Sequence, residues 1–289
     1  MSKFETHLNS YQERINQKLK GFLPSDDSVL SKAMRYSVLN GGKRLRPILV
    51  YLTNELGNAD NDSLDILAGS IELVHCYSLI HDDLPSMDDD DLRRGNPTTH
   101  IKYDEATAIL AGDALQPLAF ELLSLLKTSD TNKLMIIKSL AKACGHLGMV
   151  GGQIKDIHSH NITDVDSLDT MHSQKTGRLI QTSLETSAIL SGLDVSEVNA
   201  LTEYGSKIGL AFQIQDDIID IESPSSISGK DQGSDMSKEK VTYPAIVGLE
   251  ESKIKAEQLA LEAKEILQPL IKNTDNLSKL ADYIVARKT

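Results

Sequence analysis

Residues 62–91, DSLDILAGSIELVHCYSLIHDDLPSMDDDD, decide the fold that this sequence predicts. The segment from Asp62 to Leu84 is mostly apolar and is hydrophobic on more than one side of a helix. A helix of that kind belongs in a protein interior, because none of its faces suits water. We therefore expect a central helix that leads into a pair of aspartates, Asp82 and Asp83.

Helical spacing of apolar residues continues along most of the chain. The first predicted helix steps by three or four residues through Phe4, Leu8, Tyr11, Ile15 and Leu19. The others run from an N-cap at Ser25 or Asp26 to Asn40, then over Lys43 to Leu56, Thr98 to Leu126, Thr131 to Val150, Asp164 to Ser191, Val195 to Ile221 and, in pieces, Tyr243 to Ala286. No convincing strand, linker or repeat interrupts them, so we predict one all-α domain over residues 1–289. The irregular stretch Ser223 to Glu239 is long enough to be a functional or disordered loop.

The composition indicates a helical protein of a reducing compartment. Hydrophobic residues make up 40% of the 289 residues and aromatic residues only 4%, which favours helices over a β-sandwich. The two cysteines, Cys76 and Cys144, cannot form a disulfide framework. The N-terminus is too polar for a signal peptide, and no apolar run approaches the ~18–20 residues that span a bilayer. We predict a cytoplasmic protein without a membrane span.

The net charge of −12 argues against a nucleic-acid partner, since phosphate backbones are bound by basic surfaces. Much of the acidity is local, because residues 88–91 are four consecutive aspartates. Concentrated carboxylates need cations to neutralise them, so the charge pattern indicates metal binding.

One acidic cluster lies in the segment FQIQDDIID, residues 212–220. Asp216, Asp217 and Asp220 are spaced i, i+1 and i+4, which brings them to one side of a helix, and Gln213 joins that side. Adjacent carboxylates repel by a few kcal/mol per pair at an effective dielectric of about 20. A divalent cation removes that cost, and Mg²⁺ takes phosphate oxygens as natural co-ligands. Taken alone, the cluster could equally be a solvated acidic face.

The other cluster favours the metal. Asp82 and Asp83 are followed by Pro85, which cannot continue the helical ladder, so a widened turn can bring Asp88 back toward Asp82. Arg93 and Arg94 come next, and guanidinium groups are the usual forks for phosphate oxygens. Metal-binding carboxylates that lie beside two adjacent arginines indicate a site for a diphosphate.

Other polar groups are weaker signals on their own. Lys43, Arg44 and Arg46 cluster at a predicted helix start, where backbone N–H groups favour anions, although such a trio is more often surface decoration. His75 lies about 10 Å along the helix from Asp82 and is expected to be a core histidine unless a second anion binds there. The remaining candidates are uninformative singly: Lys175, Thr176, Lys230, and Gln153, which shares a helix face with Asp156.

Together these motifs resemble a known family. DDLPSMDDDDLRRG, GGKRLRP, QKTGRLI, FQIQDDIID and GKDQGSDMSKEKVTYPAIVGLE look like the motifs of the trans-isoprenyl diphosphate synthases, and specifically of the bacterial-type farnesyl diphosphate synthases. The resemblance runs from about residue 28 to the C-terminus. It implies an antiparallel helical bundle around a deep central cavity, the isoprenoid synthase type of fold, in a homodimer.

The resemblance also implies roles for individual residues. Metal binding falls to Asp82, Asp83, Asp88, Asp216, Asp217 and Asp220, with three Mg²⁺ ions per site that Mn²⁺ can replace. The allylic diphosphate is assigned to Arg93, Lys175 and Lys230, and isopentenyl diphosphate to Lys43, Arg46, His75 and Arg94. Oxygen dipoles for a developing carbocation come from Thr176, Gln213 and the Lys175 carbonyl, and Phe212 joins the substrate-binding set.

The implied reaction condenses isopentenyl diphosphate with dimethylallyl and geranyl diphosphate to give farnesyl diphosphate. Tyr77 and Ser78 lie where bulk before the first aspartate motif closes the tail pocket, and a Tyr there is typical of C15 producers. The alternatives are a geranylgeranyl diphosphate synthase, a terpene cyclase, a non-catalytic prenyltransferase subunit, or a cation-binding scaffold without substrate. A cyclase would not need the arginine pair or the Lys43–Arg46 cluster, and a non-catalytic subunit typically loses one aspartate motif.

Overall fold

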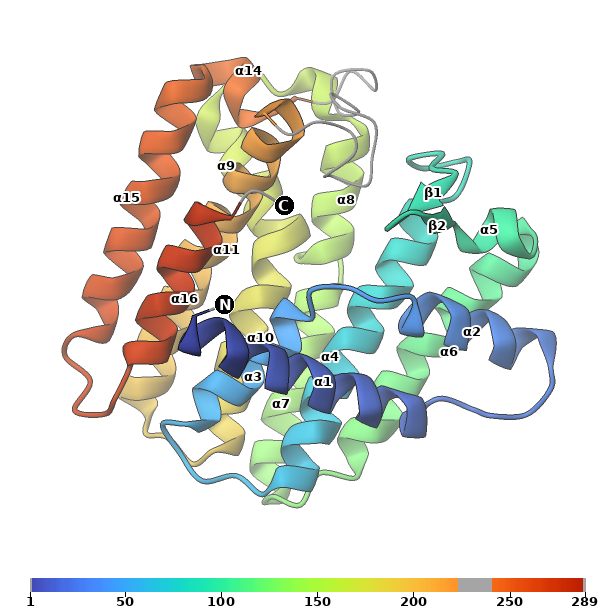
Figure 1. Cartoon of the computed structure of the whole chain (residues 1–289), viewed down its shortest axis with the longest axis horizontal. Coiled ribbons are helices and arrows are strands. Elements are labelled where there is room, and N and C mark those ends of the chain that lie inside the picture. Colours follow the sequence, from blue (N-terminus) through green and yellow to red (C-terminus); the bar gives the residue numbers. More distant parts are fainter. Residues whose placement is uncertain (1, 223–240, 288–289) are drawn as a thin grey trace. The chain divides into compact units, whose positions relative to one another are not determined.

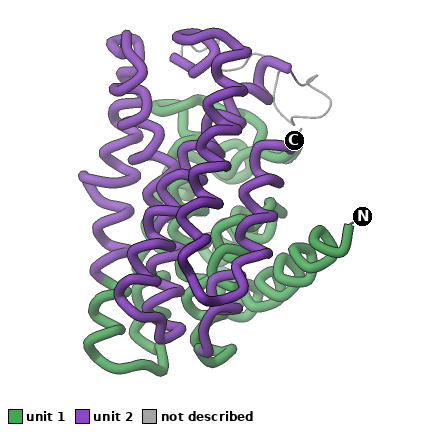
Figure 2. Tube along the Cα trace, turned by 90° about the vertical axis from the view of Figure 1, so that its left-hand side faces the viewer, with its two compact units in different colours: residues 1–51, 59–137 green, residues 52–58, 138–289 purple. Residues whose placement is uncertain are grey.

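The computed structural model describes residues 2–222 and 241–287. Helices make up most of this part of the chain (Figure 1). It forms two compact units, which Figure 2 distinguishes by colour: unit 1 comprises residues 1–51 and 59–137, and unit 2 comprises residues 52–58 and 138–289. The predicted loop Ser223 to Glu239, and Lys230 within it, lie outside the described residues.

Unit 1 is built around one long helix. Its elements are α1 (Lys3–Phe22), α2 (Val29–Leu39), most of α3 (Leu45–Asn54), α4 (Asn61–Asp82), the antiparallel strands β1 (Leu92–Arg93) and β2 (Asn96–Pro97), α5 (Thr99–Lys102), α6 (Glu105–Ser124) and the start of α7 (Asp130–Cys144). Helix α4 packs along α6, and α1 and α2 also contact it. Leu67, Ile71 and Val74 of α4 are fully buried, which confirms the predicted central helix.

Unit 2 is centred on α11 (Val195–Glu222), which packs against α10 (Arg178–Leu190), α15 (Leu249–Leu267) and α16 (Asp275–Ala286). Its other elements are the ends of α3 and α7, α8 (Met149–Ile157), the 3-10 turn η1 (Ser159–Asn161), α9 (Val165–His172), the π-helical turn η2 (Ser173–Gly177) and α14 (Tyr243–Val247). Apolar side chains of α9, α11 and α15 form one core, with Leu168, Ile214 and Leu259 among its buried members. The all-α fold class is confirmed.

Three predicted helix boundaries were wrong, and local capping explains two of them. Helix α2 is capped by Ser28, whose Oγ accepts from the Ser31 N–H, rather than by Ser25 or Asp26. The predicted helix from Thr98 to Leu126 is two helices, because the extended Asp104 caps α6 by accepting from Thr107.

The third wrong boundary is that of the predicted helix from Thr131 to Val150, which ends at Cys144, before α8 begins at Met149. In addition, the predicted helix from Asp164 to Ser191 contains the π-helical turn η2, so its hydrogen-bond pattern changes midway. The pattern of apolar residues did not predict this wider turn.

Two of the described helices are long and apolar enough to cross a bilayer by length and composition alone: α4 and α6. In α4, 78% of the apolar window is buried inside the protein, as in the core helix of a soluble protein. In α6 only 39% is buried, so a large part of that apolar helix faces outward.

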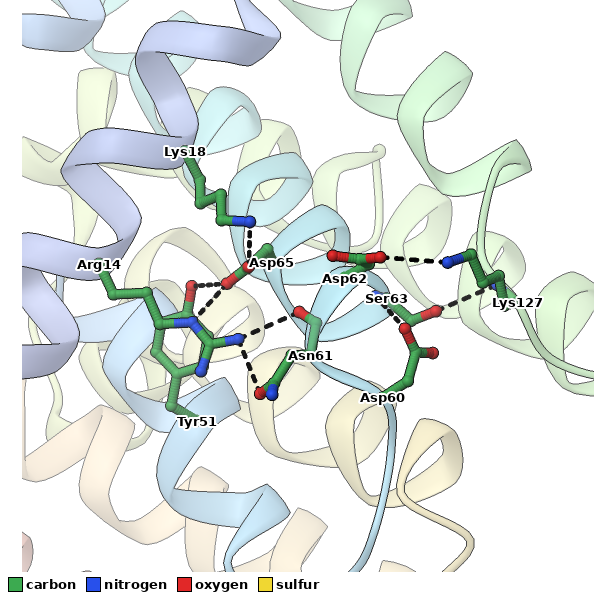
Figure 3. A network of polar contacts seen from close by, with 9 residues as sticks. All are labelled: Arg14, Lys18, Tyr51, Asp60, Asn61, Asp62, Ser63, Asp65 and Lys127. Atoms are coloured by element: carbon green, nitrogen blue, oxygen red, sulfur yellow. Dashed lines mark hydrogen bonds and ion pairs between the residues drawn. The ribbon is translucent and has the colours of Figure 1, made fainter.

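A polar network holds the N-terminal end of α4 within unit 1 (Figure 3). Asp65 of α4 is almost completely buried, and its carboxylate accepts from Arg14 Nε at 2.7 Å and from the Tyr51 hydroxyl at 2.8 Å. Lys18 Nζ lies 2.9 Å from the other oxygen. Burial and the adjacent Asp65 raise the pKa of Tyr51, so its hydroxyl stays protonated and donates. The network therefore ties α1 and α3 to α4.

We expect Asp65→Ala to lower the free energy of unfolding by about 2–3 kcal/mol, because it leaves Arg14 Nε and the buried Tyr51 hydroxyl without their acceptor. Urea denaturation measures the change. The matched control is Asp62→Ala, which removes an exposed pair with Lys127 and should cost less than about 1 kcal/mol. Equal losses in the two variants would contradict the assigned role of Asp65.

Candidate active site

The first aspartate motif lies where α4 ends, and the chain folds back on itself there. The Asp88 N–H donates to the Asp82 carbonyl at 2.9 Å, and the Asp90 N–H donates to the Asp83 carbonyl at 3.2 Å. Pro85 follows the helix end and has no N–H with which to extend it. The predicted return of Asp88 toward Asp82 is therefore confirmed at the level of the backbone.

The two adjacent aspartates of this motif have different environments. Asp83 is 3% exposed and accepts from Arg93 Nε at 2.6 Å, while the same guanidinium lies 3.4 Å from Asp90. Asp82 and Asp88 are only partly buried. Asp83 thus anchors Arg93 beside the motif, and the more accessible carboxylates are those of Asp82 and Asp88.

His75 of α4 lies within the electrostatic influence of four arginines of unit 1. Burial, and then the charges of Arg46, Arg94, Arg93 and Arg44, lower the pKa of His75 well below its ordinary value. The imidazole is therefore neutral at neutral pH, amid guanidinium groups. The four positive charges favour an anion near His75, whereas spacing alone indicated a histidine with only a core packing role.

Arg44 does not belong to that anion site, although the sequence grouped it with Lys43 and Arg46. Its side chain is 2% exposed and donates to Glu72 Oε1 at 2.7 Å and to the Val38 carbonyl at 2.6 Å. A buried guanidinium that is neutralised by a buried carboxylate has a structural role. Lys43 is exposed, and Arg46 is largely buried.

Arg94 is seated on the loop between α2 and α3. Its guanidinium donates to the Gly41 carbonyl, and a Cβ at Gly42 would lie 2.7 Å from it. Gly42 also has a φ of +126°, which a side chain would rarely adopt. Both arginines of the RRG segment line a cavity of unit 1, together with Cys76.

In unit 2, Lys175 and Thr176 lie in η2, and turns of this wider kind recur at functional sites. A Cβ at Gly209 of α11 would come within 2.8 Å of the Gly177 Cα, so the absence of side chains lets the turn approach α11 closely. The Thr176 hydroxyl donates to Gln213 Oε1 at 2.7 Å across this contact. The structure therefore brings together two residues that are 37 positions apart in the sequence.

Lys175 has a partner that the sequence did not predict. Its Nζ lies 2.5 Å from Oδ2 of Asp156, a largely buried carboxylate on α8. The only sequence signal was the shared helix face of Asp156 and Gln153. The ion pair fixes the direction of the Lys175 side chain.

The second aspartate motif, like the first, pairs a buried aspartate with a more accessible one. Asp217 is 2% exposed and accepts from Gln213 Nε2 at 3.0 Å and from the Tyr243 N–H at 3.0 Å. Asp216 is less buried, with 42% of its side chain exposed, and pairs with Arg287. Asp220 is partly buried.

Arg287 was missed by the sequence reading, because nothing in its spacing connects it to the motif. Its guanidinium also donates to the Phe212 carbonyl at 3.0 Å and stacks on the Phe212 ring at 4.1 Å. Asp216 and Phe212, both predicted site residues, are therefore held by one cation near the C-terminal end of the described chain.

The residues at the two motifs fit Mg²⁺. Within residues 2–222 and 241–287, no three His, Cys, Asp or Glu side chains are grouped as a ready-made metal site. Mg²⁺ does not require such a group, because it keeps several waters and uses one or two carboxylates with substrate phosphates. Asp82, Asp88 and Asp216 provide partly exposed carboxylates of that kind.

The two residues proposed to set product length lie one helical turn before Asp82. Tyr77 is 6% exposed and packs edge-on against the ring of His81, with centroids 5.9 Å apart. Ser78 is partly buried, and its hydroxyl donates to the His75 carbonyl at 2.9 Å. Tyr77 is thus the bulky buried side chain of the pair.

Comparison with known proteins places the chain in a family. The family described as Polyprenyl synthetase matches residues 27–284, and the chain belongs to it. The chain is 45% identical to the farnesyl diphosphate synthase of Haemophilus influenzae over the whole of both chains. It is 43% identical to that of Escherichia coli over 98% of this chain and 99% of the other.

A solved structure gives the same fold. The geranyltransferase from Helicobacter pylori, complexed with magnesium and isoprenyl diphosphate, has a TM-score of 0.86 and is 35% identical. The match covers 99% of this chain and 97% of that one. The resemblance read from the motifs is therefore confirmed.

An anion bound near His75 should raise its pKa, because negative charge offsets the arginines. We expect inorganic pyrophosphate binding at about pH 6 to be accompanied by proton uptake. Calorimetry in two buffers of different ionisation enthalpy measures it, and His75→Gln should abolish it. Equal apparent heats in both buffers for the unmodified protein would count against the cationic site.

Proposed function

We propose that this protein is a farnesyl diphosphate synthase, which condenses isopentenyl diphosphate with dimethylallyl and then geranyl diphosphate. The observation that carries the proposal is the first aspartate motif, in which Asp83 holds Arg93 beside Asp82 and Asp88. A terpene cyclase would not need Arg94 and Lys43, and a non-catalytic subunit would not need both aspartate motifs. Two free cysteines agree with a cytoplasmic location.

Mg²⁺ is the proposed cofactor, with Asp82 and Asp88 as ligands at the first motif and Asp216 as a ligand at the second. Asp83, Asp217 and Asp220 complete the two motifs. When bound, the metal neutralises the negative charge that develops on the departing diphosphate. Three ions per site, and replacement by Mn²⁺, belong to the same proposal.

The chain's own cations bind the two substrates. The allylic diphosphate is bound by Arg93, Lys175 and Lys230. When it binds, a phosphate oxygen replaces Asp156 as the partner of Lys175. A separate set binds isopentenyl diphosphate: Lys43, Arg46, His75 and Arg94. The clustering of arginines about His75 in unit 1 supports that second site.

In the proposed reaction, the carbon–oxygen bond of the allylic diphosphate breaks and both electrons leave with the diphosphate. The isopentenyl double bond attacks the resulting allylic cation, and the diphosphate takes up the proton that is lost. Thr176, Gln213 and the Lys175 carbonyl present oxygen atoms to the cation, while apolar walls that include Phe212 exclude water.

Tyr77 and Ser78 set the product length in this proposal. Tyr77 is buried and bulky, so it closes the tail pocket after a C15 chain. A geranylgeranyl diphosphate synthase, with a C20 product, is the second candidate.

We also propose a homodimer that forms through α6. Ile109 and Leu110 on this helix are 42% and 58% exposed, in a segment apolar enough to resemble a membrane span. A second copy of the chain would cover this face.

Sedimentation equilibrium of the wild type should give twice the mass of one chain, whereas the Leu110→Asp variant should have the mass of a single chain. The control variant Leu261→Asp, at a similarly exposed leucine of α15, should stay dimeric. A monomeric wild-type chain would contradict the proposal.

The direct test is incubation with Mg²⁺, isopentenyl diphosphate and geranyl diphosphate, followed by chromatography of the dephosphorylated products. We expect farnesol from the wild type. Asp82→Ala and Asp216→Ala should each lose more than about a hundredfold in turnover, since each 1.4 kcal/mol of barrier is roughly tenfold. The control Glu203→Ala changes an exposed carboxylate of α11 and should keep normal turnover. An Asp82→Ala enzyme with half the normal rate would show the metal assignment to be wrong.

Shortening Tyr77 should lengthen the product. We expect Tyr77→Ala to yield geranylgeraniol and longer alcohols in the same assay, because the cavity left by the ring admits further isoprene units. Tyr283→Ala, at a partly exposed tyrosine of α16, serves as the control and should still yield farnesol. Unchanged product length in Tyr77→Ala would remove Tyr77 from the proposal.

A further inference from the structure

A connected set of polar contacts in unit 2 runs from the π-helical turn to the start of α14. Thr176 donates to Gln213 Oε1 at 2.7 Å, and Gln213 Nε2 donates to Asp217 Oδ1 at 3.0 Å. The other oxygen of Asp217 accepts from the Tyr243 N–H at 3.0 Å and lies 3.3 Å from His172 Nε2. Four elements, α9, η2, α11 and α14, therefore contribute to this set.

The direction of every donation in this set follows from one group. A backbone N–H can only donate, so the Tyr243 N–H requires an acceptor at Asp217. An ionised carboxylate only accepts, so Asp217 requires the amide nitrogen of Gln213 to face it. The amide oxygen of Gln213 must then face Thr176, whose hydroxyl hydrogen points toward it. The lone pairs of Thr176 Oγ1 are left on the other side of that bond.

Burial makes this arrangement costly to change. Asp217 is 2% exposed and His172 is 4% exposed, so neither can turn to water. His172 stacks on the Tyr243 ring at 6.0 Å, and the Tyr243 hydroxyl donates to Asp169. Burial and the contact with Asp169 raise the pKa of Tyr243, so it remains a donor. His172 and Tyr243 thus enclose the carboxylate oxygen that does not face Gln213.

We propose that Asp217, held by the Tyr243 N–H and packed against His172, is a positioning residue that fixes the polarity of the Gln213 amide and the Thr176 hydroxyl, so that their oxygen atoms, and not their hydrogens, face the allylic cation. This inference rests on the proposed function, which places Thr176 and Gln213 beside that cation. His172 and Tyr243 had no assigned role, and Asp217 acts here through Gln213 and not as a metal ligand.

Asp217→Asn tests the polarity because it should reverse it. The Tyr243 N–H still needs an acceptor, so the oxygen of the new amide takes that position and its NH₂ group faces Gln213. The Gln213 amide must then flip and present its own NH₂ group to Thr176. We expect the turnover number to fall at least a hundredfold, while the affinity for inorganic pyrophosphate with Mg²⁺, measured by calorimetry, changes less than threefold.

The double variant Asp217→Asn with Gln213→Glu is the rescue. A carboxylate at position 213 accepts from both the amide introduced at position 217 and the Thr176 hydroxyl, which restores the original polarity. We expect it to recover at least tenfold of the lost turnover. His172→Gln should lower turnover about tenfold with the same unchanged pyrophosphate affinity, and its control is His160→Gln, at an exposed histidine of η1 that should behave as wild type.

Two results would overturn the inference. If Asp217→Asn weakens Mg²⁺-dependent pyrophosphate binding as strongly as Asp216→Asn does, Asp217 is a metal ligand. If the double variant is no better than Asp217→Asn, polarity is not what Asp217 supplies.

Failure of the proposed function is separately visible, since the wild type would then elongate no allylic diphosphate. In that case the side-chain amide resonances of Gln213, identified by their loss in Gln213→Glu, decide the polarity alone. They should shift in Asp217→Asn and stay unchanged in His160→Gln, and their constancy in Asp217→Asn would refute the relay.

Discussion

A buried carboxylate is stable only when protein groups donate to it, and this constraint organises both aspartate motifs. Asp83 and Asp217 are nearly inaccessible, and each is satisfied by donors of its own unit. Because these two carboxylates are occupied, they hold Arg93 and Gln213 in fixed directions. The neighbouring Asp82 and Asp216 stay partly exposed, where a cation could reach them.

Adjacent aspartates can differ in burial and in partners because neighbouring positions on a helix face different surroundings. Consecutive side chains of a helix point roughly 100° apart, so at the edge of its buried face one can turn toward the core while its neighbour stays accessible. The inward aspartate must find donors, and the outward one need not. The more accessible aspartate can instead pair with a cation. In the described chain, the Arg287 guanidinium pairs with Asp216, the carboxylate proposed to bind metal.

The sequence predicted the all-α class, the central helix α4 and the return of Asp88, because each depends on local spacing and on Pro85. It could not predict the partners of Lys175, Asp216 and Asp217, because those contacts join residues that lie 19, 71 and 26 positions apart. The boundary at Asp104 was missed because the apolar pattern continues across it, although the Asp104 side chain caps the helix that follows. Arg44 was misread because its basic side chain gave no sign of its buried partner Glu72.

The central proposal is that the carboxylates of each aspartate motif bind Mg²⁺ together with a diphosphate. Calorimetric titration of inorganic pyrophosphate, with and without Mg²⁺, measures this binding directly. We predict one binding event that requires Mg²⁺ and that is lost in Asp82→Ala and in Asp216→Ala alike, while binding at the His75 site does not require the metal. A titration that is unchanged by Mg²⁺, or a Mg²⁺-dependent event that survives loss of either aspartate, would contradict the proposal.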